Sequence, residues 1–147
     1  EVDRVTVVDI NADVINLIQQ SGILDQLSAH AREKLTIIHD DALTWRPDHA
    51  VDTLLADIWL KLVEPDKFDQ ARRMQENIQA KQVYVWGQEP EIWKLCQARQ
   101  GSDRPPDRSL IDAVVEADIR LPLILPDWDD FGERLVEMGQ WWCQGQS

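Results

Sequence analysis

The stretch VTVVDINADVI, residues 5–15, decides how the rest of the chain is interpreted. Its β-branched run Val5-Thr6-Val7-Val8 predicts a short buried strand of a parallel sheet. Asp9 ends that strand, and Asn11 is a residue type that commonly caps the first turn of a helix. The stretch therefore predicts a strand, an acid at its carboxyl end, and a helix that crosses back over the sheet.

The same alternation of strand and helix continues through the first hundred residues. Further strands are expected over residues 35–38, 51–56 and 82–86, and helices are expected to start at 64–66 and 89–91. Strands that alternate with helices form parallel sheets through right-handed crossovers. The predicted fold class is therefore α/β, a Rossmann-like and mostly parallel sheet with helices on both faces.

The loop at residues 101–108, rich in Gly, Ser, Asp and Pro, divides the chain. Residues 1–100 are predicted to form a Rossmann-like, cofactor-type region, and residues 101–147 a C-terminal extension that packs on the same domain. In the extension, Ser109 is expected to cap a helix that runs through Ala117, and another helix is expected over residues 127–138. The tail that contains Trp141-Trp142 is expected to pack.

The apolar run at residues 121–125 is harder to interpret as a strand. It contains Pro122 and is followed by Pro126. Proline cannot donate a ladder hydrogen bond, so these residues argue against a central strand.

Composition limits the classes of partner. The formal net charge is −12, with 27 acidic residues against 15 Lys and Arg. This balance argues against nucleic acid and against an anionic membrane as the main partner, because both require clustered positive charge. Cys96 and Cys143 lie far apart and form no CxxC motif, which favours a reducing, cytoplasmic location. No apolar run approaches the ~20 residues that span a bilayer.

Acids follow three of the four predicted strands: Asp9, Asp41 and Asp57. Ligands of open parallel sheets bind at the carboxyl ends of the strands, so these acids are expected to share one edge. An ionised carboxylate accepts several hydrogen bonds, which suits it to ribose hydroxyls and to an adenine amino group. Each acid also has a purely structural alternative, as a helix cap, a polar turn or a group bound by nearby amides.

VTVVDINADVI, LTIIHDDALTW (residues 35–45) and VDTLLADIW (residues 51–59) together resemble class I S-adenosylmethionine-dependent methyltransferases, and within them the spermidine synthase-like branch. That family has an acid ending its second strand, an Asp-Ala pair after its third and an acid ending its fourth. The resemblance implies that Asp9, with its neighbour Ile10, holds the ribose, and that Asp41 and Ala42 hold the adenine. It implies that Asp57 is the catalytic residue that orients or deprotonates the acceptor.

One expected feature of this family is missing. In such folds a glycine-rich loop lies about 20 residues before the ribose acid, whereas only eight residues precede Asp9 and the chain has no GxGxG motif. The strand that carries the loop would lie between the second and fourth strands. The fold is therefore expected to lack or replace its first strand. A missing N-terminal segment, a partner chain or another segment of this chain, for which residues 121–125 are the only apolar candidate, each remain open as its source, and a homo-oligomer is a further open alternative.

The first functional hypothesis is an S-adenosylmethionine-dependent methyltransferase that acts on a small-molecule acceptor, with Trp59 as a wall of the substrate pocket. Core packing is the alternative for Trp59. The second hypothesis is a non-catalytic interaction or regulatory module that keeps the fold and has lost the cofactor site. A dinucleotide-dependent reductase is a weaker third. No metal site is expected, because His39 with Asp40 and Asp41 falls short of a full ligand set.

Overall fold

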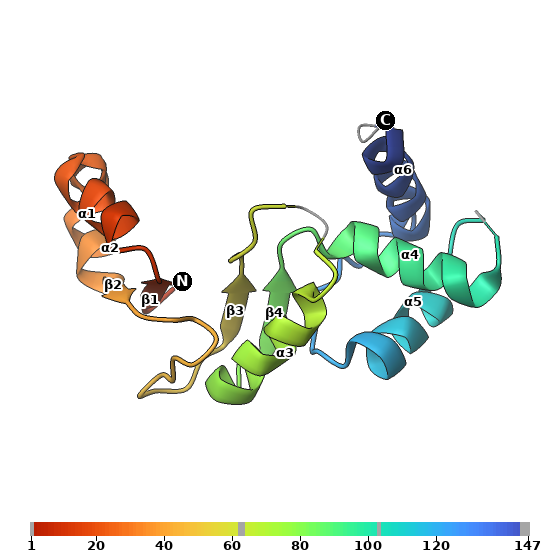
Figure 1. Cartoon of the computed structure of the whole chain (residues 1–147), viewed down its shortest axis with the longest axis horizontal. Helices are drawn as coiled ribbons and strands as arrows, with labels where there is room; N and C mark the ends of the chain where they lie inside the picture. Colours follow the sequence, from red (N-terminus) through yellow and green to blue (C-terminus); the bar gives the residue numbers. More distant parts are fainter. Residues whose placement is uncertain (1, 62–63, 103, 145–147) are drawn as a thin grey trace. The chain divides into compact units, whose positions relative to one another are not determined.

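The computed structural model describes residues 2–61, 64–102 and 104–144 (Figure 1). The chain divides into two compact units, Glu1–Arg46 and Pro47–Ser147. The described residues form six α-helices and four strands, and the strands pair as two separate two-stranded parallel sheets. The predicted mixed α/β class is confirmed at this level. Each unit is described by itself below.

The first unit is built on the two strands predicted at its ends. Its elements are β1 (Val5–Asp9), α1 (Ala12–Gln20), the 3-10 helix η1 (Ile23–Gln26), α2 (Ala29–Lys34) and β2 (Leu35–His39). β1 and β2 run parallel, in a register that pairs Val5 with Leu35 and Asp9 with His39. The helices form the long connection that parallel strands require.

The start of α1 is confirmed as predicted. The Asn11 side-chain oxygen accepts hydrogen bonds from the backbone N–H groups of Asp13 (2.9 Å) and Val14 (3.3 Å). The helix ends at Gln20 with Ser21 as its C-cap, and the following Gly22 has a φ of 73°, a left-handed conformation that glycine adopts without steric cost. Asn11 thus places the helix directly after the acid that ends β1.

The second unit begins with another parallel pair. It contains β3 (Thr53–Ala56), α3 (Lys67–Ile78), β4 (Gln82–Val85) and α4 (Gln88–Gln100). β3 and β4 pair from Thr53–Gln82 to Ala56–Val85, and Figure 1 shows α3 lying against this pair. The buried side chains of α3 are Lys67, Ala71, Met74 and Ile78, so the helix packs on the sheet through one stripe.

The apolar run at residues 121–125 pairs with the other edge of β4. The Val83 N–H donates to the Pro122 carbonyl (2.8 Å), and the Ile124 N–H donates to the Val83 carbonyl (2.7 Å). This is a single parallel bridge between Val83 and Leu123. Pro122 contributes only its carbonyl, so the proline is accommodated where no N–H is needed.

The C-terminal helices differ in detail from the prediction. They are α5 (Arg108–Val114), the π-helix η2 (Val115–Ile119) and α6 (Phe131–Gln144). The expected cap at Ser109 is wrong, because the Asp107 carboxylate accepts the Leu110 N–H (2.9 Å) and Asp107 therefore caps α5. The expected packing of the tail is also wrong for Trp141, whose side chain is 70% exposed.

A close helix–helix contact closes the core of the second unit. Gly139 of α6 lies against the buried ring of Trp93 on α4, and a Cβ atom at this position would overlap ring atoms Cδ2 and Cε3. Only a residue without a side chain lets the two helices approach this closely. α4 and α6 are in extensive contact, so residues beyond the loop at 101–108 pack on the same unit as β4.

We expect Gly139→Ala to destabilise the chain by about 1 kcal/mol or more. Alanine favours a helix over glycine by about 1 kcal/mol, but overpacking a filled core typically costs about 1–3 kcal/mol. Urea unfolding followed by circular dichroism measures the difference. The control is Gln140→Ala, at the next and exposed position of α6. If Gly139→Ala proves at least as stable as this control, residue 139 does not pack tightly against the Trp93 ring.

Candidate functional site

Two of the predicted site residues meet at the carboxyl ends of β1 and β2. Asp9 is the last residue of β1 and lies opposite His39, the last residue of β2. The Asp40 N–H continues the pairing by donating to the Asp9 carbonyl (3.1 Å). Asp9 and Asp41 therefore share one edge of this sheet, as the parallel arrangement predicts. Their binding roles stay predictions.

Each acid at this edge already accepts a local hydrogen bond. One oxygen of Asp9 accepts the Asn11 N–H (2.7 Å), and one oxygen of Asp41 accepts the Leu43 N–H (2.9 Å). The Asp40 carboxylate accepts the Asp41 N–H (2.7 Å). A carboxylate has about four acceptor positions, so these bonds fix the acids in place and leave acceptor capacity for a ligand.

The two neighbours named with these acids have different environments. The side chain of Ile10 is exposed, and its carbonyl oxygen lies 3.0 Å from Nε2 of His39. Ala42 is half-buried in the turn that follows Asp41. Among the described residues, no group of three or more His, Cys, Asp or Glu side chains is arranged to hold a metal ion.

Asp57 lies in the second unit, directly after β3, and is exposed. The Trp86 N–H extends the pairing at this end by donating to the Ala56 carbonyl (2.9 Å). Asp57 thus occupies the carboxyl edge of its own parallel pair. That it shares one edge with Asp9 and Asp41 stays a prediction, because β3 and β4 form a separate sheet. Its negative charge helps to raise the pKa of Tyr84, although burial of the phenol is the larger cause.

A buried lysine dominates this edge of β3 and β4. Lys67, the first residue of α3, is 1% exposed. Its ammonium donates to the Trp86 carbonyl (2.7 Å) and lies 5.2 Å and 5.1 Å from the ring centroids of Trp59 and Trp86. Indole faces attract cations at such distances. The group of Lys67, Trp59 and Trp86 is called the lysine cage below.

Burial and nearby negative charge shift the pKa of Lys67 in opposite directions. Burial lowers the pKa of the Lys67 ammonium, and the acids around it, with Glu91 first and Asp57 next, oppose that shift. Burial also raises the pKa of Glu89, whose carboxylate lies 3.5 Å from the Tyr84 hydroxyl. The edge therefore combines a dehydrated amine, two indole faces and several carboxylates.

Trp59, the predicted wall of a substrate pocket, packs on α3 in the structure. Its ring faces the Lys67 ammonium, and its indole N–H donates to the Gln70 side-chain oxygen (2.9 Å). Contact between Trp59 and a substrate stays a prediction. Lys67 was not predicted as a site residue, although its spacing from Ala71, Met74 and Ile78 matches a helical stripe.

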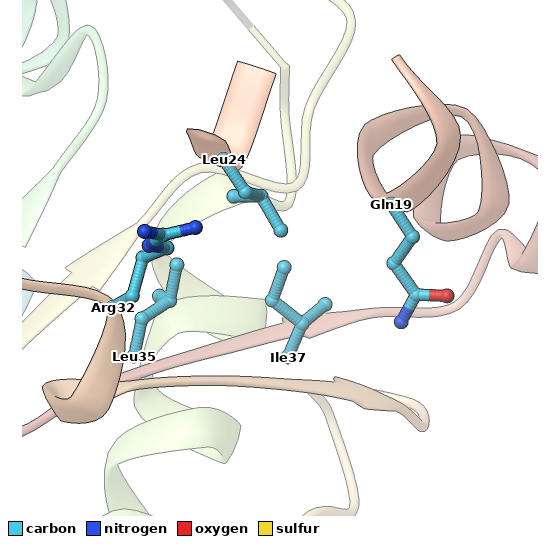
Figure 2. A pocket seen from close by; sticks show the side chains of 5 residues that line it. All are labelled: Gln19, Leu24, Arg32, Leu35 and Ile37. Atoms are coloured by element: carbon cyan, nitrogen blue, oxygen red, sulfur yellow. The ribbon is translucent and has the colours of Figure 1, made fainter. Parts of the chain in front are cut away.

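A shallow hollow of about 230 Å³ lies in the first unit (Figure 2). Gln19, Leu24, Arg32, Leu35 and Ile37 line it. Figure 2 shows the Leu24 side chain extending toward Leu35 and Ile37 of β2. The hollow is smaller than the ~300 Å³ at which ligand pockets begin, and it contains none of the predicted site residues.

Comparisons with known proteins give no family assignment: no family model, no curated protein and no solved structure matches the chain. None of the helices in the described ranges is both long and apolar enough to cross a membrane.

We expect Lys67→Met to destabilise the second unit by about 1–3 kcal/mol. Methionine keeps a long apolar side chain, but it leaves the part-buried Trp86 carbonyl without this donor, which costs about that much. The control is Lys81→Met, since Lys81 is an exposed lysine paired with Asp52 and such pairs contribute about 0–1 kcal/mol. Urea unfolding of both variants measures the difference, and equal stabilities would contradict the cage.

We expect Cys96 to react slowly with alkylating reagents. It is fully buried on α4, and burial raises the pKa of its thiol from 9.0 to about 11. At pH 8 the thiolate fraction is then about 100-fold lower than at the ordinary pKa, and the thiolate is the reactive form. Iodoacetamide labelling of a Cys143→Ser chain, followed by mass spectrometry from pH 7 to 10, tests this. Labelling as fast as that of the urea-unfolded chain at pH 8 would contradict it.

Proposed function

We propose that the chain is a methyltransferase-like α/β domain that binds S-adenosylmethionine and acts on a small-molecule acceptor. The observation that carries this proposal is the meeting of Asp9 and Asp41 at the carboxyl ends of the parallel strands β1 and β2. Ligands of open parallel sheets bind at this position. Asp9, with Ile10, would hold the ribose, and Asp41, with Ala42, would hold the adenine.

The pairing of the strands supports the finer, Rossmann-like arrangement. β1 pairs with β2 and β3 with β4, both in parallel, and no strand among the described residues joins the two pairs. A Rossmann-like sheet without the strand between β1 and β3 would leave these two pairs. The glycine-rich loop is absent from the 147 residues, so the strand and its loop would be supplied by another segment.

The chemistry assigned to the chain is mainly positional. The bound cofactor would supply an electrophilic methyl group to an acceptor nucleophile. Asp57 would orient the acceptor or accept its proton, since it is an exposed carboxylate at the carboxyl end of β3. Trp59, packed on Lys67, would bound the acceptor side. Fixed carboxylates and excluded water contribute to such reactions through orientation and electrostatics.

A second candidate is a non-catalytic interaction or regulatory module. Two observations favour it: Asp9 and Asp41 each serve a local turn through a backbone hydrogen bond, and the sequence has no glycine-rich loop of the kind that holds such a cofactor. In this alternative the acids only terminate strands and start turns. The two candidates differ in whether the chain binds the cofactor.

We expect calorimetric titration with S-adenosylmethionine and S-adenosylhomocysteine to show saturable binding that Asp9→Asn weakens at least tenfold. Loss of a charge-assisted hydrogen bond costs about 1.5–3 kcal/mol, and about 1.4 kcal/mol corresponds to tenfold. Glu33→Gln is the matched control, because Glu33 is an exposed acid on α2 of the same unit.

The titration is repeated on the chain extended at its amino end by its upstream reading frame. Binding by the extended chain alone supports the cofactor site and assigns the loop to the added segment. An absence of heat and of thermal shift in both forms favours the non-catalytic module. Equal weakening by Asp9→Asn and Glu33→Gln would mean that Asp9 has no specific role.

A further inference from the structure

Helix α6 is apolar on two sides. Phe131, Leu135 and Gly139 face the core of the second unit and are buried. Met138 and Trp141 are 41% and 70% exposed. Together with Arg134 they follow spacings of four and three residues, so these three positions share one helix face. This face is distinct from the one that packs on α4.

A tryptophan that precedes the helix extends this exposed face. Trp128 is 56% exposed, and the Arg134 guanidinium lies 5.2 Å from the centroid of its ring. At the other end, the rings of Trp141 and Trp142 lie 6.4 Å apart. Trp128, Met138 and Trp141, with Arg134 between them, are called the α6 stripe. Exposed apolar side chains that gather on one face commonly mark a binding surface.

The charge around the stripe indicates the kind of partner. Residues 127–141 carry five acids, namely Asp127, Asp129, Asp130, Glu133 and Glu137, against the single base Arg134, a formal charge of −4. Arg134 is already engaged, because its guanidinium donates to the Asp130 carboxylate (2.9 Å). The border of the stripe is therefore negative, and it would attract a cationic partner.

The same charge argues against two other occupants. A second copy docked face to face on the stripe would bring both acidic borders together, and like charges across an interface are repulsive. An anionic membrane surface would be repelled as well, since membrane-bound helices use basic residues for this contact. The apolar area needs a partner whose own border is positive.

We propose that the α6 stripe is a docking surface for a cationic amphipathic helix of another protein. The partner helix would pack its apolar face on Trp128, Met138 and Trp141, and would place Lys or Arg side chains near Glu133 and Glu137. Tryptophan is enriched among the residues that dominate binding energy at interfaces, and amphipathic helices bind protein surfaces through apolar anchors spaced three or four residues apart. The surface lies on α6 and the residues just before it, and does not depend on the proposed cofactor site.

The test uses a fluorescently labelled 18-residue peptide with Leu at helical i, i+3, i+4 positions and Lys elsewhere. Fluorescence anisotropy on the full chain is expected to show saturable one-to-one binding. Trp141→Gln should weaken it at least tenfold, and a rise in salt should weaken it further. The same peptide with Glu in place of Lys should not bind.

Leu17→Gln is the matched control variant, because Leu17 is a 67% exposed apolar residue on α1. Circular dichroism shows whether each variant is folded, and Met138→Gln repeats the test if Trp141→Gln is not. Equal weakening by Leu17→Gln, equal binding of the Glu peptide, or no binding at all would overturn the proposal. The proposal would also be overturned if the chain dimerises and Trp141→Gln abolishes the dimer. Binding of the chain to anionic lipid vesicles that Trp141→Gln abolishes would overturn it as well.

Discussion

The carboxyl edge of β3 and β4 depends on the contacts that the buried Lys67 ammonium makes with Trp59 and Trp86. These contacts join three elements: α3, which supplies the lysine, the segment after β3, which supplies Trp59, and the end of β4, which supplies Trp86. Removing an ammonium from water costs several kcal/mol. Burial lowers the pKa of the Lys67 ammonium, while Glu91 and Asp57 oppose that shift. The cage connects the start of α3 to the carboxyl ends of β3 and β4. Asp57 lies in the segment whose path this cage helps to define.

The first unit depends on a different constraint. It has one short parallel pair, and Ile15 is the single buried apolar side chain among its described residues. Two-stranded sheets are marginal without further packing. Val5 and Val7 on β1 and Leu17 on α1 stay exposed, so residues 2–46 leave several apolar side chains uncovered. A site at Asp9 and Asp41 would gain rigidity from any segment that covers this surface.

The features that depend on local pattern could be predicted from the sequence. The four strands and the cap at Asn11 follow from β-branched runs and from a side chain that bonds its own backbone, and the structure confirms them. The burial of Lys67 could not be predicted. A charged residue in an apolar stripe is buried only when groups distant in the sequence, such as the Trp86 carbonyl, accept its hydrogen bonds. The pairing of Leu123 with Val83 was not predicted, because Pro122 and Pro126 argue against a strand. The pairing requires only two hydrogen bonds, and neither of them needs a proline N–H. The start at Asp107 rather than Ser109 reflects a competition between two good caps. The binding roles of Asp9, Asp41 and Asp57 depend on a ligand, and residue type and position alone do not decide them.

The bridge between Val83 and Leu123 has a consequence for biosynthesis. Its two partners are separated by 40 positions in the chain, so β4 is translated well before the segment that covers its second edge. Until that segment has joined the fold, the edge of β4 at Val83 stays open, although Val83 is fully buried in the final structure. Open apolar edges are sites of aggregation and of chaperone binding. A chain that ends before Leu123 would therefore keep this edge of β4 uncovered and would be prone to aggregate.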